Sequence, residues 1–305
     1  MTWGGGAAPF SGKGKSMRET TTTRQIETKI HQPFDLHMHS TCSDGGEAPA
    51  DVIEFAAARG VTLAALTDHD GVAGVKEAVE AGKRSGVRVL PSIEMDTEWP
   101  HELHILGLDL DVDDANLQSA LETARKRRVE RNAEIVRRLE TAGYGVERYM
   151  SRRIEVATRL HIALALVRGG YAENLHGAFR DYLRRGKPGY YAVERFSPEE
   201  VISLIRGAGG VPVWAHPTHG NPNLHSLAEK LQTMGVLGLE AYHPSIGEGD
   251  SDTLVSIARQ KGLIVTCGSD YHGANRPDVT IGQTWRDIPA LNECRAFFEA
   301  RPVRE

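Results

Sequence analysis

The stretch VTLAALTDHD, residues 61–70, decides the fold. Its apolar first half has the length and residue types of a buried strand, and it ends in four consecutive polar residues. Nearly all of the chain's other apolar runs also place a His, Asp or Glu at or just past their C-terminal end. Parallel barrels carry their active sites at this end of their strands. The other runs are PFDLHMH (33–39), VRVLPSIE (87–94), LHILGLDL (103–110), VPVWAHP (211–217), VLGLEAYHP (236–244) and LIVTCGSDYH (263–272).

Helical segments separate many of these runs. PADVIEFAAARG (49–60) and SDTLVSIARQKG (251–262) have helical apolar spacing and end in glycine. In the segment that begins at Ser197, the residues Ser197, Pro198 and Glu200 match a capping box with proline at the first helical position. Alternating strands and helices predict an α/β fold with about seven strands.

Charge and composition divide the 305 residues into three parts. The net charge is −5, yet residues 121–196 carry 17 Lys and Arg against 9 Asp and Glu. We expect residues 31–112 and 197–305 to form a barrel domain, and residues 113–196 to form a basic helical insertion. Residues 1–30 contain little apolar material and are expected to be a disordered leader. The charged stretch 121–150 is equally well explained as a solvated helix face.

Cysteine and hydropathy patterns indicate the compartment. The three cysteines, Cys42, Cys267 and Cys294, are widely spaced and form no CxxC pair, which argues against a disulfide framework. No run of about 18 apolar residues suggests a membrane span. We expect a cytoplasmic protein that does not bind membranes, and nothing in the sequence implies an obligate protein partner.

The first half of the chain contains several candidate metal ligands. His37 and His39 are two apart on an expected strand, so both project to the same face. Asp44 follows in a loop, and His69 ends the run quoted above. Glu94 ends the next run, where a carboxylate could bridge two cations or serve as an ordinary capping or salt-bridged acid.

Further candidates come later in the chain. His104 lies just before a continuous apolar run, while His161 lies on an apolar helical stretch, where a lone histidine is more often a core residue. His216 directly follows another apolar run, and Asp270 and His272 repeat the two-residue spacing. His243 also follows a run, and we treat it as a rim residue.

Together these side chains predict a multinuclear metal centre. Burying about nine imidazoles and carboxylates without a cation to coordinate would be costly. A mixed nitrogen and carboxylate ligand set favours manganese, with zinc or iron as alternatives, in two or three sites. Such centres catalyse phosphoester hydrolysis. We therefore expect an enzyme, and the basic insertion would then face an anionic substrate.

The motifs in order resemble the PHP (polymerase and histidinol phosphatase) family. The resemblance covers residues 34–273 and is carried by the following motifs: His37-Met38-His39, Ser43-Asp44-Gly45, Thr67-Asp68-His69-Asp70, Glu94, Ala215-His216-Pro217 and Gly268-Ser269-Asp270-Tyr271-His272. It implies a distorted seven-stranded (β/α) barrel of the amidohydrolase-like kind, with a small helical insertion. Within the family the chain looks most like the bacterial 3′,5′-bisphosphate nucleotide phosphatases and 5′-to-3′ exoribonucleases.

The resemblance also implies a ligand set for three metal ions. His37, His39, Glu94 and Asp270 would hold one ion, and Glu94 would bridge to a second. His104 and His161 would complete the second site, because Arg159-Leu160-His161 resembles a segment in the insertion of these phosphatases. Asp44, His69 and His272 would hold the third ion.

The resemblance assigns further residues to the substrate and to catalysis. Arg159 and Lys187 would grip a second phosphate, and His216 would contact either a metal or the phosphate. His216, His272 and Asp270 are the candidate catalytic residues. An arginine expected near Leu164 is missing.

The expected activity is metal-dependent hydrolysis of phosphate monoesters. The expected substrates are 3′,5′-bisphosphate nucleotides or short 5′-phosphorylated oligonucleotides. One alternative is a histidinol-phosphate phosphatase, which needs no second phosphate pocket. A non-enzymatic alternative is an RNA-binding module with structural metals, whose binding would survive chelation.

Overall fold

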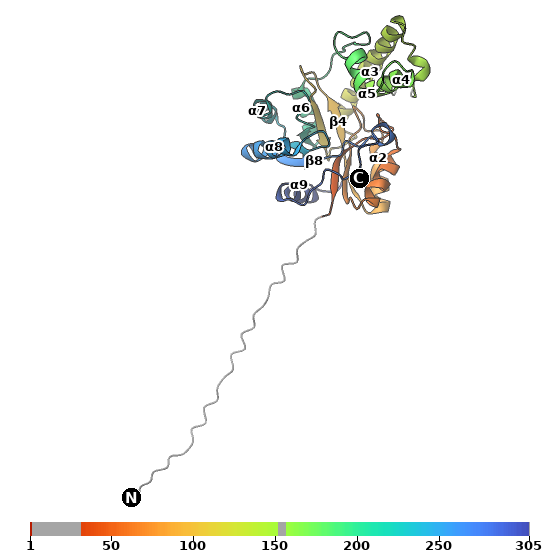
Figure 1. The fold of residues 1–305 in the computed structure, drawn as a ribbon. Helices are drawn as coiled ribbons and strands as arrows, with labels where there is room; N and C mark the ends of the chain where they lie inside the picture. The colour runs from red at the N-terminus through yellow and green to blue at the C-terminus, as the bar shows by residue number, and fades with distance from the viewer. Residues whose placement is uncertain (2–31, 152–156, 305) are drawn as a thin grey trace. The chain divides into compact units, whose positions relative to one another are not determined.

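The structure is a computed structural model that describes residue 1 and residues 32–151 and 157–304. All helices and strands given below belong to the compact unit His31–Glu305 (Figure 1). The leader expected over residues 1–30 lies outside the described residues apart from Met1. Within the described ranges, no helix is long and apolar enough to cross a membrane.

Eight strands in the described residues form two sheets, which corrects the seven-stranded barrel expected from the sequence. The first sheet has the order β1-β2-β3 and is parallel throughout. The second has the order β4-β5-β6-β7-β8, in which β5 is antiparallel to both of its neighbours. The strands are β1 (Phe34–Met38), β2 (Leu63–Leu66), β3 (Arg88–Pro91), β4 (Ile93–Asp96), β5 (His104–Leu108), β6 (Val211–Trp214), β7 (Gly238–Tyr242) and β8 (Ile264–Cys267).

The eighth strand arises because the apolar run 87–94 is divided at Ser92. Before this residue β3 pairs with β2, and after it β4 pairs with β5. The Ser92 hydroxyl donates to the carbonyl of Leu90 at 3.0 Å, which supports the change of direction. Pro91 has no backbone N–H with which to continue a ladder. The apolar pattern of the run alone did not reveal this break.

The antiparallel orientation of β5 explains the position of His104. His104 is the first residue of β5, whereas His39, His69 and Asp270 lie in the loops that follow β1, β2 and β8. A short connection joins β4 to β5 without a helix, so β5 runs in the opposite direction. The start of β5 therefore lies at the same edge as the C-terminal ends of the parallel strands.

The two sheets meet through residues at the edge that carries the polar side chains. Met38 forms a parallel bridge with Tyr271, and His69 forms one with Glu94. All four of these residues are candidate metal ligands or lie next to one in the sequence. The junctions between the sheets consequently fix the positions of the same loops that carry the candidate site.

Helices cover the sheets, with the apolar core between them. All of β1 and β2 is buried, and Ser197 and Glu200 form the expected capping box at the start of α6. The helices are α1 (Pro49–Ala58), α2 (Val75–Ser85), α3 (Ala115–Thr141), α4 (Arg159–Arg168), α5 (Leu175–Ala178), α6 (Pro198–Gly207), α7 (Leu224–Met234), α8 (Glu248–Lys261) and α9 (Pro289–Glu299), with short turns η1 (Glu147–Tyr149), η2 (Phe179–Leu183) and η3 (Gly273–Asn275).

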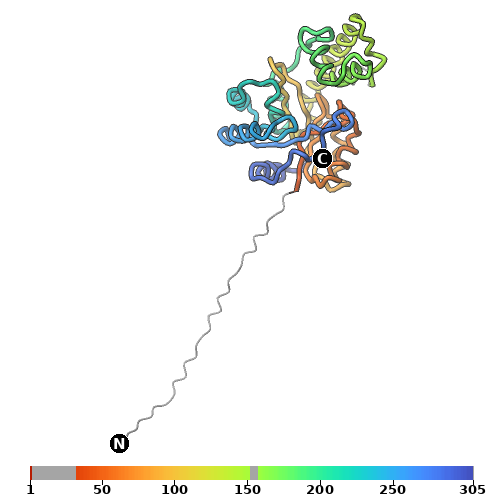
Figure 2. The backbone as a smooth tube through the Cα atoms, in the orientation of Figure 1, coloured from red at the N-terminus to blue at the C-terminus, as the bar shows by residue number. Residues whose placement is uncertain are grey.

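Helices α3, α4 and α5 lie together as a group (Figure 2). This group has an apolar core of its own. Ile135 and Leu139 of α3 pack in this helical core, whereas Leu117 and Leu121 near the start of α3 pack in the core of the sheets. The long helix therefore belongs to both cores. The division at residues 112 and 197 stays a prediction, although α3 and α6 begin close to these positions.

Candidate metal centre

Eight of the nine predicted metal ligands come together at the shared edge of the sheets. All eight belong to groups of three or four His, Asp and Glu residues whose donor atoms, one from each residue, lie within 4.8 Å of one another. The groups in the described residues are His39, Asp44, His69 and His272; His37, His39 and Glu94; His37, His243 and Asp270; His69, Glu94 and His104; and Glu102, His104 and His216.

Glu94 lies at the centre of this arrangement. Its Oε2 atom is 3.3 Å from Nε2 of His37, 3.3 Å from Nε2 of His39 and 3.2 Å from Nδ1 of His69. These three buried ring nitrogens have no hydrogen-bond partner in the described structure. Burial raises the pKa of Glu94, but the nearby imidazoles of His69, His37 and His104 outweigh it and hold the pKa well below its ordinary value. The carboxylate is therefore ionised among imidazoles that converge on it.

The tautomer of His37 is fixed by a carboxylate behind it. Nδ1 of His37 lies 3.2 Å from Oε1 of Glu240, and both side chains are fully buried. An ionised carboxylate only accepts hydrogen bonds, so Nδ1 carries the proton. Burial lowers the pKa of His37, but the carboxylates of Glu240, Glu94 and Asp270 outweigh it and raise the pKa well above its ordinary value. Nε2, which faces Glu94, would therefore release its proton when a cation binds between them.

His272 repeats this arrangement on the other side of the site. Its Nδ1 donates to the backbone carbonyl of Asp270 at 2.8 Å, which places the proton on that atom. Its Nε2 lies 3.2 Å from Oδ1 of Asp44 and is therefore the ring nitrogen available to a cation shared with that carboxylate. The donor set thus fits divalent metal ions, in agreement with the sequence-based expectation of a metal site.

His104 and His216 face the second oxygen of Glu94. Nδ1 of His104 is 2.9 Å and Nε2 of His216 is 3.1 Å from Oε1 of Glu94. The two rings lie 5.0 Å apart. Burial lowers the pKa of His216 to about 4, which favours the neutral imidazole that metal ions require. His216 therefore has the position beside Glu94 and His104 that the sequence analysis gave to His161.

His161 is not brought together with the other predicted ligands. It is the third residue of α4, where its Nδ1 accepts from the backbone N–H of Thr158 at 3.1 Å as part of a capping box. His161 belongs to none of the metal-capable groups in the described residues. Its contact with the site is indirect, because the hydroxyl of Thr158 donates to Oδ2 of Asp44 at 3.1 Å.

His243 is a buried support for Asp270 and not the expected rim residue. Its Nδ1 accepts from the backbone N–H of Ser245 at 3.1 Å, so the proton is on Nε2. Nε2 then donates to Oδ2 of Asp270 at 3.2 Å. Only 3% of His243 is exposed.

Strained backbone holds several of these residues. Asp70, His216 and Asp270 have φ angles of 47°, 29° and 53°, in the left-handed region that non-glycine residues rarely adopt. Such conformations persist only where the surrounding structure enforces them, and they are frequent at active sites. The three positions lie in the loops after β2, β6 and β8.

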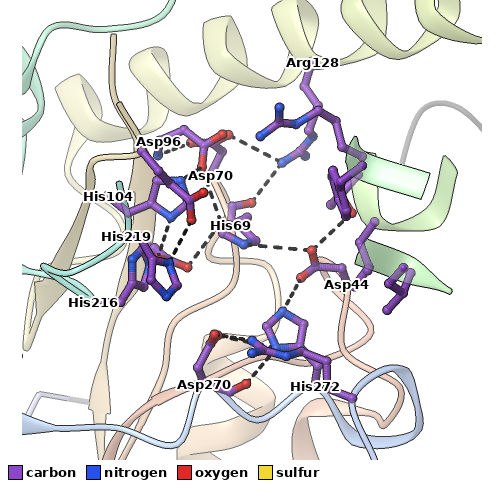
Figure 3. A pocket seen from close by; sticks show the side chains of 18 of the residues that line it. Asp44, His69, Asp70, Asp96, His104, Arg128, His216, His219, Asp270 and His272 are labelled. Atoms are coloured by element: carbon purple, nitrogen blue, oxygen red, sulfur yellow. Dashed lines mark hydrogen bonds and ion pairs between the residues drawn. The ribbon is translucent and has the colours of Figure 1, made fainter. Parts of the chain in front are cut away.

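The cluster opens into a cavity of about 510 Å³, of which Figure 3 shows the lining. Arg159 lines this cavity, as the sequence analysis expected, whereas Lys187 is exposed and is not one of the described lining residues. Arg131 also lines it and is only 6% exposed. Burial and the neighbouring Arg159 lower the pKa of Arg131 to about 9, which leaves it charged at neutral pH. Two cations are thus held together beside the site.

Sequence reasoning missed five residues that shape this site. Glu240 is an acid in the middle of the apolar strand β7, and that placement was the available signal. Arg131 lies on α3 among many charged residues and gave no comparable signal. The others are Asp96, which is 3.2 Å from His104, and Glu102 and His219, which are paired at 3.2 Å.

Comparisons with known proteins identify the family of this fold. The model of the PHP domain family matches residues 35–171. A 3′,5′-nucleoside bisphosphate phosphatase of Chromobacterium violaceum is 36% identical over 89% of this chain and 98% of its own length. The 5′-3′ exoribonuclease Rnm of Escherichia coli is 33% identical over 78% of this chain and 85% of its own. The solved structure of a Chromobacterium violaceum amidohydrolase, with bound sulfate and no metal, superimposes with a TM-score of 0.79 at 35% identity. That superposition covers 87% of this chain and 96% of the other.

The fold and the His–carboxylate site define a phosphoesterase of the PHP type, and the chain belongs to the PHP domain family. It is therefore a phosphoester hydrolase, the class to which both named relatives belong. The family expected from the sequence motifs is confirmed.

Proposed function

We propose that this chain is a metal-dependent phosphatase of nucleotides that carry a second phosphate, such as 3′,5′-bisphosphate nucleotides, and of short 5′-phosphorylated oligonucleotides. The observation that carries this proposal is one cavity lined by two kinds of group. The imidazole and carboxylate cluster around Glu94 lines it, and so do the guanidinium groups of the buried Arg131 and the half-buried Arg159. A substrate with two anionic groups suits both.

The proposed metal ligands follow the sequence-based set with one exchange. His37, His39, Glu94 and Asp270 would hold one ion, and Asp44, His69 and His272 another. Glu94 would also contribute to a third ion with His104, and His216 takes the place of His161 because it lies beside Glu94. Manganese is the proposed ion, with zinc or iron as alternatives. When bound, the ions supply an activated water and charge stabilisation for the phosphoryl group.

The chain's own residues hold these ligands in position. Glu240 orients His37, and the carbonyl of Asp270 orients His272. Such outer partners fix ring orientation and raise ligand basicity. His216 and His272, together with Asp270, are therefore proposed to act in catalysis through the metal ions. Neither histidine is assigned the proton transfer to the leaving oxygen, because Nε2 of each already faces a carboxylate.

Arg131 and Arg159 are proposed to bind the phosphate that is not cleaved. Burial lowers the pKa of both guanidinium groups, and the positive charge of Arg159 lowers that of Arg131 further, so the two groups repel each other. A phosphate between them removes the repulsion and accepts paired hydrogen bonds from either fork. The printed names of the two relatives, a nucleoside bisphosphate phosphatase and an exoribonuclease, support a substrate of this kind.

Phosphate release by the manganese-loaded full chain tests the proposal. The substrates are adenosine 3′,5′-bisphosphate, a short 5′-phosphorylated RNA and histidinol phosphate. We expect rapid release from the bisphosphate or the RNA. Preference for histidinol phosphate would establish the alternative phosphatase. Salt-sensitive RNA binding that survives chelation, without turnover, would establish the RNA-binding alternative.

Substitution of the residues proposed to bind the uncleaved phosphate tests that role directly. Arg159→Ala should lower kcat/KM for adenosine 3′,5′-bisphosphate about 10- to 100-fold, which corresponds to the loss of charge-assisted hydrogen bonds. The matched control is Arg185→Ala, because Arg185 is exposed and is not among the cavity-lining residues of the described structure. Lys187→Ala tests whether Lys187 binds the second phosphate, as the sequence analysis expected. A fall in kcat/KM as large as that of Arg159→Ala would show that it does.

A further inference from the structure

One wall of the cavity differs in chemistry from the rest. Leu160 at the start of α4, Leu175 at the start of α5 and Phe179 at the start of η2 all line it and are half-buried. The remaining described lining is almost entirely imidazole, carboxylate and guanidinium groups. These three apolar side chains contribute nothing to the binding of phosphates or metal ions.

Leu175 and Phe179 are held from behind by the helical core. Both pack against the cluster that contains Leu166 and Leu183, while part of their surface faces the cavity. Leu160 packs against neither of the two apolar cores of the described structure. Its exposed surface in a polar cavity has no evident role in folding. An apolar surface that folding leaves open beside polar groups is typical of a ligand site.

The backbone at Phe179 is also unusual. Phe179 begins a π-helical turn that continues to Leu183. Turns of this kind are rare and occur frequently at functional sites. The rare turn thus begins at Phe179, the aromatic residue that lines the cavity. This observation does not depend on the composition of the wall.

We infer that Leu160, Leu175 and Phe179 form a nucleobase seat, on which the base of the substrate stacks while its phosphates reach the metal cluster and the arginines. The inference rests on the proposed nucleotide substrate and names the part of the chain that holds the base. An aromatic face suits any nucleobase, because every base has a π-face. A cavity of about 510 Å³ also lies in the size range of sites that enclose a small ligand.

The experiment compares two substrates that differ only in the base. One is adenosine 3′,5′-bisphosphate, and the other is methyl riboside 3,5-bisphosphate, which has both phosphates and no base. We expect kcat/KM for the abasic compound to be about 5- to 150-fold lower, the range measured for the loss of one stacked base. The manganese-loaded full chain is used throughout.

Variants then locate the effect. Phe179→Leu keeps the packing against the helical core and removes the aromatic face, so the ratio of the two kcat/KM values should fall several-fold toward one. Leu160→Ala should lower the same ratio, and because Leu160 belongs to neither core, this variant is expected to fold. The control is Phe55→Leu, because Phe55 is 46% exposed and lies on α1, outside this cavity.

The outcomes separate the seat from the proposed function. Equal kcat/KM for the two substrates in the wild-type chain overturns the seat and leaves the bisphosphate phosphatase intact. The seat is also overturned if the ratio of the two kcat/KM values in Phe179→Leu and Leu160→Ala equals that of the wild type. This outcome requires that both variants show a cooperative thermal unfolding transition. Hydrolysis of neither substrate refutes the proposed function and the seat together.

Discussion

Glu240→Gln should weaken metal binding although Glu240 is not a proposed ligand. Glu240 is fully buried and accepts from two donors: Nδ1 of His37 at 3.2 Å and the backbone N–H of His216 at 2.9 Å. Glutamine has the same shape but only one acceptor oxygen. In either orientation its amide NH₂ group faces one of these donors. A buried donor left unsatisfied costs about 1–3 kcal/mol.

Loss of the hydrogen bond to Glu240 should weaken metal binding because it changes the tautomer of His37. Without an obligate acceptor behind Nδ1, the proton can move to Nε2, the nitrogen that faces Glu94. Loss of such an orienting partner typically weakens metal affinity about 10- to 100-fold. We expect this weakening in a titration against a chromogenic chelator. The same variant should shift the ¹⁵N signals of His37 in the zinc-loaded protein toward the other tautomer.

The control is Glu229→Gln on α7. The carboxylate of Glu229 is exposed, and its ion-pair partner is Lys261, at 3.7 Å, not a residue of the metal site. That variant should bind metal like the wild type. Metal affinity of Glu240→Gln within about twofold of the wild type, together with unchanged His37 signals, would refute the reasoning that the carboxylate fixes the tautomer.

The remaining predictions concern stability and are measured by denaturant unfolding. Gly268→Ala should destabilise the protein by about 1–3 kcal/mol, because the added methyl carbon would lie 2.2 Å from Cβ of His37; an unchanged midpoint would contradict this. Arg301→Ala should cost about 1–3 kcal/mol, because it removes the hydrogen-bonded partner of Asp109, which is only 1% exposed, and leaves this carboxylate with Arg304 at 3.7 Å. A cost below 0.5 kcal/mol, on the order of an exposed pair, would show that the pair contributes little. Leu139→Ala should cost about 2–5 kcal/mol through a cavity in the helical core, and a smaller loss would mean that this core collapses around the gap.

The strand ends were predictable because their chemistry is local. A buried run followed by polar residues, as in residues 61–70, identifies both the strand and the edge at which it ends. His37, His39, His69 and Asp270 were found by this signal, and the structure places them together. The family motifs in order confirmed the class.

The remaining features depend on contacts between distant segments. The reversal of β5 and the break at Ser92 arise from pairing, which an apolar pattern does not encode. The sequence assigned His161 to the second metal ion only through the family resemblance, and only the tertiary arrangement shows that His216 lies beside Glu94. Arg131 was hidden in a charged helix until the structure showed that it is buried.

Metal content and phosphate release, measured on the same sample, test the central claim most directly. The full chain is stripped with a chelator, reloaded with manganese, desalted and divided between elemental analysis and hydrolysis of adenosine 3′,5′-bisphosphate. We expect more than one manganese ion per chain, with phosphate release lost on stripping and regained on reloading. Glu94→Gln should retain less metal and lose turnover while its unfolding curve changes little. Phosphate release that persists after stripping, or full turnover by Glu94→Gln, would contradict the account.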